Sequence, residues 1–331
     1  MEEKNKSKSL VEAGIMVTII LVFMILSNFP LIGNIIGFII PIPIALLYLK
    51  YGLKISITSI VASGILVSLF MGPISGIQVA ISSGIVGLVL GLCVKRKFSG
   101  IKSLVCLIAV NTFSIFSELA LLFSALTGIT FKDYVDELVK VFNETAKLSE
   151  QMMGGSQANP MVEVMKSVDS NFIISMMPIV LVTAIIIRAF LNYTIGKYFI
   201  NKLGFKLNSL PPFSKWYFNP ILIALVVVIN IIVTFLVSRG IINNKGLYIL
   251  SLNMLFTMLI IQGLAVAANF LKYKLKFSNF FVVFLSILMV SSMPQLFGVL
   301  GLIDVLFDIR GVDKNSLGSY IKEKIRKKGN S

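Results

Sequence analysis

The sequence predicts an all-α fold, a polytopic integral membrane bundle with about eight to ten helical membrane segments. Three observations support this fold class. Hydrophobic residues make up 56% of the 331 residues and charged residues only 14%, which is far more apolar than a soluble domain. Several apolar runs approach the length of a helix that crosses the hydrocarbon core. Lys and Arg gather between these runs, as they do in cytoplasmic loops.

The apolar runs define the expected membrane segments in chain order. At about 1.5 Å per residue, a run of about twenty residues crosses a core of about 30 Å. The expected segments cover residues 11–27, 34–50, 55–71, 76–94, 103–127, 171–195, 218–238, 247–271 and the longer run 278–309.

The second segment, NIIGFIIPIPIALLYLKYGLK, contains Pro41 and Pro43. Proline removes a backbone donor and disfavours helical geometry in the residue before it, so the pair predicts a structural helix break near Ile40. Carbonyls freed at membrane depth need protein neighbours or a polar cavity. We therefore expect other helices of the bundle, or a polar cavity, to supply partners for the backbone groups at this break.

The fourth segment carries Ser83, Gly87 and Gly91 at four-residue spacing. Small residues with this spacing let another helix backbone approach closely, which predicts a helix-packing face. Gln78, nearer the outer end of the segment, is a candidate to face a cavity.

The fifth segment places Asn111, Ser114 and Glu118 at positions i, i+3 and i+7, on one helical face. Polar residues inside the membrane are costly, so this face is expected to point into the bundle. Together with Gln78, these residues are the candidate substrate-binding set. An equally weighted alternative is that Glu118 only holds two helices together by a hydrogen bond.

Arg188 in the sixth segment is a candidate partner of Glu118. By helical rise it lies about 9 Å closer to the cytoplasm than Glu118. The favoured interpretation is therefore that Arg188 reaches the inner headgroups together with Lys197.

An insertion between the fifth and sixth segments, residues 128–170, has apolar residues at helical spacing. This pattern predicts an amphipathic helix over 131–153, with a capping box of Thr130 and Asp133, and a second short helix over 161–168. We expect the insertion to lie externally on the membrane surface; a lid over the bundle is the less favoured alternative.

The distribution of basic residues predicts a cytoplasmic N-terminus, residues 1–10. Residues 310–331 contain a basic cluster of Lys322, Lys324, Arg326, Lys327 and Lys328, and are expected to be cytoplasmic too. An odd number of crossings would place this tail outside, so Pro294 is expected to break the run 278–309 into a helical hairpin or re-entrant pair. The alternative is one full span with an external tail.

Enzyme chemistry is mostly excluded by the residue types that are absent. The chain has no histidine and only two cysteines, Cys93 and Cys106, so it offers no His-based catalysis and no metal site. It also contains no phosphate-binding loop motif. We expect no enzyme activity, no cofactor and no nucleic-acid partner.

Several stretches resemble the YybS-like membrane proteins, a Firmicutes family of unknown function. They include the proline pair and, later, MGPISG, LPPFSKWYFNP, QGLAVAANFLKYKLK and GLIDVLFDIR. The family is grouped with the substrate-binding S components of energy-coupling factor transporters. The resemblance implies a six-helix, S-component-like membrane domain over 11–200, followed by further membrane helices over 203–309.

In S components, external loops close over a small ligand, so the resemblance implicates residues 28–33, 72–76 and the insertion. It also implies partners, namely a separate transmembrane coupling subunit and ATPases. The usual Ala-x-x-x-Ala docking pattern is replaced here by Gly14 and Thr18. We expect a transport-related protein of the bacterial plasma membrane that captures a small solute. The alternative is a non-transport membrane scaffold or cell-envelope interaction protein that binds the anionic lipid bilayer.

Overall fold

The computed structural model describes residues 2–29, 33–125, 130–152, 162, 168–241 and 245–313. Every regular element in these ranges is a helix, which confirms the all-α fold class. The chain divides into two compact units: unit 1 comprises Met1–Ser170 and Val180–Leu210, and unit 2 comprises Asn171–Ile179 and Pro211–Ser331. The helix expected over 161–168 and most of the tail expected over 310–331 lie outside the described residues.

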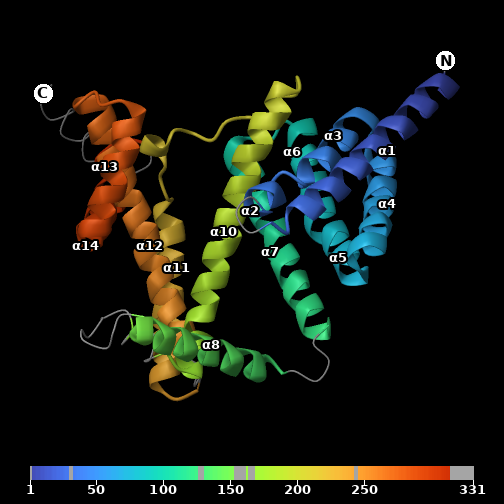
Figure 1. The fold of residues 1–331 in the computed structure, drawn as a ribbon. Helices are drawn as coiled ribbons and strands as arrows, with labels where there is room; N and C mark the ends of the chain where they lie inside the picture. The colour runs from blue at the N-terminus through green and yellow to red at the C-terminus, as the bar shows by residue number, and fades with distance from the viewer. Residues whose placement is uncertain are drawn as a thin grey trace, which may run out of the picture. The chain divides into compact units, whose positions relative to one another are not determined.

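Unit 1 contains the N-terminal helices, drawn in blue to green in Figure 1. They are α1 (Glu2–Leu26), α2 (Gly33–Gly37), α3 (Pro41–Tyr51), α4 (Leu53–Met71), α5 (Pro73–Gln78), the π-helix η1 (Val79–Ile85), α6 (Val86–Lys95), α7 (Gly100–Ala125), α8 (Phe131–Met152) and most of α10 (Ser170–Lys202).

The segment expected over 34–50 is not one membrane-spanning helix. It is divided into the short helices α2 and α3, with turns at residues 38–40 and Pro41 as the first residue of α3. Proline is tolerated at this position because the N–H that it lacks would have no intrahelical partner there. The prolines thus shorten the segment, and α3 is only 11 residues long.

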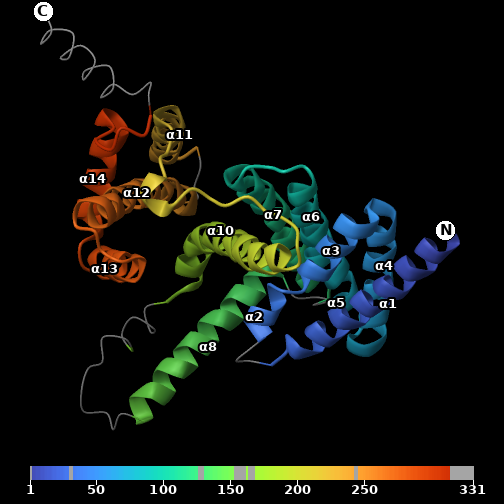
Figure 2. The same ribbon diagram turned by 90° about the horizontal axis from the view of Figure 1, so that it is seen from above.

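Helix α3 lies among α1, α4 and α6 (Figure 2), and its residues from Pro41 to Leu47 are all buried. Its closest neighbour is α6, whose small residues let the two helix backbones approach each other. A Cβ atom added at Gly87 would lie 2.4 Å from the carbonyl oxygen of Pro41. Residue 87 therefore has to be glycine for the two backbones to approach this closely.

The helix expected over 131–153 is α8, which lies crosswise to α7 (Figure 1). Its start has the complete capping box: Thr130 N–H and Oγ1 donate to Asp133 Oδ2 at 2.8 and 2.6 Å. In return, Asp133 N–H donates to Thr130 Oγ1 at 3.2 Å. Edge-to-face contacts of Phe123 with Phe131 and Tyr134 join α7 to α8.

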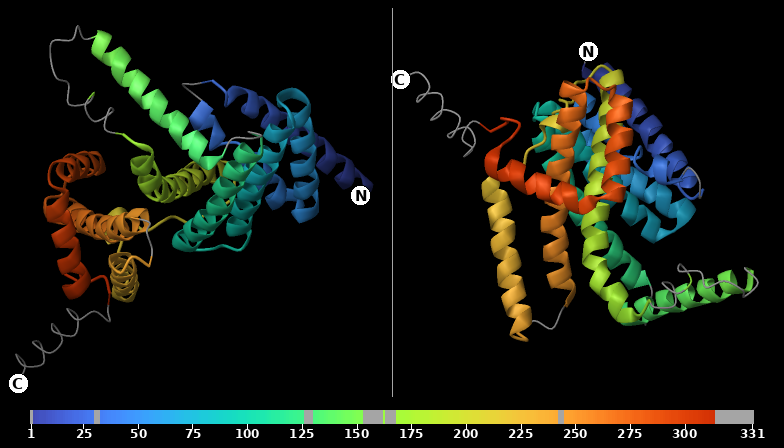
Figure 3. Two further views of the ribbon diagram at one scale, coloured as in Figure 1. Left: turned by 90° about the horizontal axis from the view of Figure 1, so that it is seen from below. Right: turned by 90° about the vertical axis from the view of Figure 1, so that its left-hand side faces the viewer.

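Unit 2 contains the C-terminal helices, drawn in yellow to red in Figure 3. Their core includes Ile223, Val226, Met258 and Val305. The elements are the 3-10 turn η2 (Phe213–Lys215), α11 (Pro220–Ser238), α12 (Lys245–Asn269), the π-helix η3 (Phe270–Lys274), α13 (Asn279–Ser292) and α14 (Pro294–Phe307).

The run expected over 278–309 breaks at Pro294, where α14 begins. Met293 departs from helical geometry, with φ −143° and ψ 60°, and the helical arms on either side meet at 106°. The run therefore does not continue as one straight helix. The break expected at Pro294 is therefore present, and a bend of this size suits either a broken span or a re-entrant pair.

Within the described residues, seven helices are long and apolar enough to cross a membrane, or eight if the bent pair counts as one span. Their large exposed apolar side chains, such as Ile221 at 77% and Leu69 at 77%, suit contact with lipid rather than water. The molecule is thus a multi-pass membrane protein. The seven are Ser7–Leu26, Leu53–Met71, Pro73–Lys95, Gly100–Phe123, Ser170–Lys202, Pro220–Ser238 and Leu247–Lys274.

Candidate functional site

The candidate site lies between α7 and α10, two helices of membrane-spanning length in unit 1. Asn111 and Ser114 are fully buried, and Glu118, one turn further along α7, is partly buried. Because these positions share one face of the helix, their side chains meet α10 together. The structure thus brings together three of the four candidate substrate-binding residues.

Glu118 forms a two-pronged ion pair with Arg188 of α10. Arg188 Nη1 donates to Oε2 at 2.9 Å and Nη2 donates to Oε1 at 2.8 Å. Ser114 Oγ also donates to Oε1, at 3.2 Å. Bidentate guanidinium–carboxylate pairs are the strongest and most directional of protein ion pairs. The two side chains keep 23% and 27% exposure, so the pair is not sealed inside the helix interface.

About two turns from the ion pair, Asn192 of α10 donates from Nδ2 to Asn111 Oδ1 at 3.1 Å. Asn111 in turn donates to the Leu107 carbonyl of its own helix at 2.8 Å. Both asparagines are buried. The asparagine pair and the ion pair thus form a polar stripe between α7 and α10, with one charge of each sign.

The expectation that Arg188 reaches the headgroups together with Lys197 is wrong. Arg188 binds Glu118, and Lys197 donates instead to Ser209 Oγ at 2.8 Å. The expected segment ended at residue 195, but α10 continues to Lys202. Because α10 continues seven residues further than expected, Arg188 lies about 10 Å further from the C-terminal end of its helix. This difference offsets the separation in depth between Arg188 and Glu118 that was inferred from the sequence.

Gln78 does not join this stripe. It is the last residue of α5, its side chain is exposed, and its carbonyl accepts a hydrogen bond from Ser82 Oγ at 2.6 Å. The adjoining π-helix η1 packs against α7 and buries Ser82 and Ser83. A π-helical turn is rare and is frequently found at functional sites.

A second polar cluster, in unit 2, was not identified from the sequence. Asp304 of α14 is fully buried and Arg310 has only 2% side-chain exposure. Asp304 Oδ2 accepts from Arg310 Nε at 3.1 Å, from Arg310 Nη2 at 2.8 Å and from Gln262 Nε2 at 2.7 Å. Gln262 Oε1 accepts the Phe218 N–H at 2.9 Å.

Arg310 also fixes the irregular chain before α11. Its Nη1 donates to the Ser214 carbonyl at 2.9 Å, and its Nη2 donates to the Trp216 carbonyl at 2.7 Å. These partners come from the stretches LPPFSKWYFNP, QGLAVAANFLKYKLK and GLIDVLFDIR. The signal in the sequence for this cluster was a pair of opposite charges, Asp304 and Arg310, beside an apolar run. Their spacing of six residues does not show that the chain between them turns so that the two side chains meet.

Tyr217 lies beside this cluster, outside the candidate spans, and its Oη donates to the Val305 carbonyl at 3.4 Å. Burial, with the negative charges of Asp308, Asp313 and Asp304, raises the pKa of Tyr217 to about 12. The phenol therefore stays neutral at physiological pH. Within the described residues, no three Cys, Asp or Glu side chains gather as metal ligands would.

Comparisons with known proteins agree with the membrane architecture. A model of the family described as "Predicted membrane protein (DUF2232)" matches residues 16–305. The uncharacterized protein YybS of Bacillus subtilis (strain 168) is 24% identical over 271 residues, which cover 79% of this chain and 84% of that protein. No solved structure matches the chain. Because the family model covers most of its length, the chain belongs to the DUF2232 family of predicted membrane proteins.

Proposed function

We propose that the protein captures a small solute for transport across a bacterial plasma membrane, with its N-terminus in the cytoplasm and without catalysis of its own. The Glu118–Arg188 ion pair between α7 and α10 is the observation that carries this proposal. Ionisable residues within membrane spans are rare because they are costly, and they commonly mark the pathways of substrates or ions.

The chemistry of the stripe suggests the class of solute. A carboxylate on the solute could replace Glu118 on the guanidinium, and an amino group could bind the carboxylate of Glu118. The partial exposure of both side chains leaves room for such an exchange. The nearby π-helix η1 supports a functional role for this region.

Energy for transport would have to come from other chains, because this sequence has no phosphate-binding loop motif. We propose a separate transmembrane coupling subunit and ATPases as partners. Gentle purification from native membranes tests this point. Stoichiometric recovery of two ATPase chains with a membrane subunit is the expected result, and recovery of the protein alone would contradict it.

A membrane scaffold is the second candidate, and one specific observation favours it. The polar residues of the stripe satisfy one another: Asn192 binds Asn111, and Arg188 binds Glu118. Such reciprocal pairing is what residues that only hold helices together would show. A test of solute capture must therefore separate loss of binding from loss of packing.

The decisive test is ligand-dependent thermal stabilisation of the purified full-length protein. The unfolding temperature is measured with a panel of small carboxylates, amines and zwitterions, for the wild type, E118Q, R188Q and the control E137Q. Glu137 forms an exposed ion pair with Lys140 on α8, so E137Q removes a pair outside the stripe. We expect one class of solute to stabilise the wild type and E137Q but not E118Q or R188Q. Equal shifts in all four proteins, or no shift at all, would contradict solute capture at the stripe and favour the scaffold function.

A further inference from the structure

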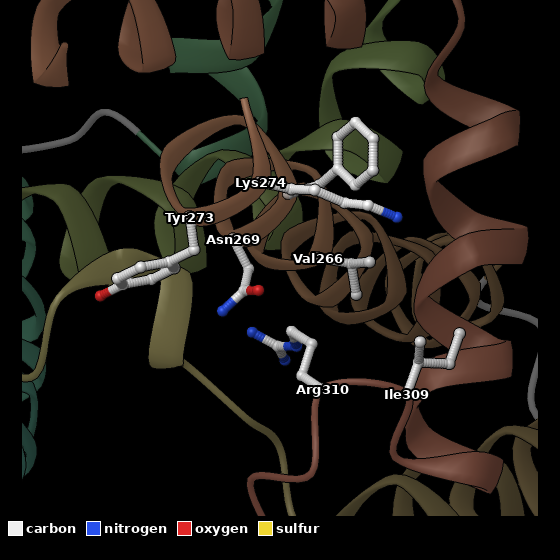
Figure 4. Close-up of a pocket in the computed structure, with 7 residues that line it drawn as sticks. Val266, Asn269, Tyr273, Lys274, Ile309 and Arg310 are labelled. Carbon is white, nitrogen blue, oxygen red and sulfur yellow. The ribbon is translucent and has the colours of Figure 1, made fainter. Parts of the chain in front are cut away.

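A cavity of about 290 Å³ opens at the η3 end of α12 in unit 2. It is lined by residues of α12, η3 and the chain after α14 (Figure 4). These residues are Val266, Asn269, Phe270, Tyr273, Lys274, Ile309 and Arg310.

The polar side of the cavity is held in place by partly buried hydrogen bonds. Asn269 Nδ2 and Arg310 Nη1 both donate to the Ser214 carbonyl, at 3.3 and 2.9 Å. Asp304 fixes the other edge of the guanidinium. A guanidinium has five N–H groups, and the bonds of Arg310 to described residues leave one N–H of Nη1 without a partner.

The lining residues carry two cations, Lys274 and Arg310, and no carboxylate. Lys274 is exposed, and its Nζ lies over the Phe270 ring at 5.3 Å from the ring centroid, within the range of a cation–π contact. Lys272 and Lys276 belong to the same basic segment. An anion that enters the cavity therefore meets a fixed guanidinium, which pairs with Asp304 and keeps one N–H without a partner among the described residues, and a movable ammonium.

The remaining lining is apolar and comes from Val266, Phe270 and Ile309. The cavity also lies at the end of a candidate span, Leu247–Lys274, which is where a spanning helix meets the headgroup layer. Apolar walls beside basic side chains at this depth suit a molecule with a phosphate head and a hydrocarbon tail.

We infer that this cavity binds a phosphate ester anion, with the phosphate between Lys274 and Arg310. The apolar walls favour the headgroup of an anionic phospholipid over a soluble phosphate ester as the source. This inference is independent of solute capture at the α7–α10 stripe, because the two sites share no residue.

The test is native mass spectrometry of the full-length protein in a neutral detergent. The probes are dihexanoyl phosphatidylglycerol, dihexanoyl phosphatidylcholine and glycerol 3-phosphate. The variants are K274Q, which removes the movable cation, and V266W, which fills the cavity. The matched control is K102Q, because Lys102 is also an exposed lysine whose Nζ lies over a ring, that of Phe98, at 4.2 Å.

We expect phosphatidylglycerol to bind the wild type and K102Q alike, and to bind K274Q and V266W about tenfold more weakly. Phosphatidylcholine should bind poorly to all four proteins. If glycerol 3-phosphate binds as tightly as the lipid and is weakened by the same variants, the cavity is a phosphate site, but its ligand is a soluble ester. Binding that K274Q and V266W leave unchanged, or no binding of any probe, would overturn the inference.

Discussion

At the residue scale, the Glu118–Arg188 pair can be tested with a double-mutant cycle. E118Q and R188Q each leave one unpaired charge in a span, so each should lower the free energy of unfolding by about 1.5–3 kcal/mol. The double variant should lose less than the sum, because both charges disappear together. Denaturation in detergent measures all three values. Strictly additive losses would mean that the two side chains do not interact.

Arg310 should tolerate even a conservative change poorly. Its planar guanidinium serves Asp304, Ser214 and Trp216 at once, and a lysine cannot reproduce this geometry. R310K should therefore lower the free energy of unfolding by about 3–5 kcal/mol, the loss typical of a broken buried ion pair. The control is R239K, because Arg239 is exposed over the Phe235 ring. Equal losses in the two variants would contradict the proposed importance of the cluster.

A site is predictable from the sequence when its residues lie close together in the chain, on one helix, and less so when they meet only in the folded structure. Asn111, Ser114 and Glu118 lie on one helix, so periodicity alone predicted their common face. The pairing with Arg188 depends on where α10 ends, and a long apolar run does not mark its ends precisely. Gln262, Asp304 and Ser214 meet only through tertiary packing of α12, α14 and an irregular segment, for which the sequence has no periodic signal.

At the scale of elements, the crossing of α12 and α14 depends on two glycines. A Cβ atom at Gly263 would lie 2.0 Å from the Phe297 carbonyl oxygen, and one at Gly301 would lie 1.8 Å from that of Leu259. G263A should cost about 1–3 kcal/mol of unfolding free energy through overpacking. G14A is the control: a Cβ there meets nothing within 4 Å, so alanine should raise helix stability by up to about 1 kcal/mol. A neutral G263A would contradict the close crossing.

The start of α8 should respond to pH through its capping box. Hydrogen bonds from the Thr130 side chain and backbone lower the pKa of Asp133. A lowered folded-state pKa means that the stabilisation is present above the unfolded pKa and is lost as the pH falls through the folded value. Hydrogen exchange of the first-turn amides should therefore be slower in the wild type than in D133N at pH 6, and equal once the carboxyl is protonated.

The control for this experiment is E137Q, which changes a carboxylate of the same helix that forms only an exposed pair with Lys140. Its first-turn exchange should match that of the wild type at every pH. A wild type that exchanges like D133N at pH 6 would mean that the capping box does not protect the helix start.

For the whole molecule, composition and apolar runs predicted the all-helical membrane class, because the bilayer permits few alternatives. The seven candidate spans each overlap an expected segment. The two expected segments that broke, 34–50 and 278–309, each have a proline at the break, whereas Pro178 lies inside α10 and does not end that helix. A proline in an apolar run therefore marks a possible helix end, but it does not give the direction in which the chain continues, so the sequence did not predict the 106° bend at Pro294.

Whether α13 and α14 together cross the membrane decides on which side of the membrane the basic tail lies, and this can be measured. Cys93 and Cys106 are the only cysteines, so a variant without them accepts single reporters at Ser99, between α6 and α7, and at Ser331. The density of Lys and Arg predicts that both positions are cytoplasmic. A membrane-impermeant thiol reagent applied to intact cells should then label neither S99C nor S331C, and should label both after the cells are opened. Labelling of S331C alone in intact cells would mean that α13 and α14 together cross the membrane once and that the tail lies outside.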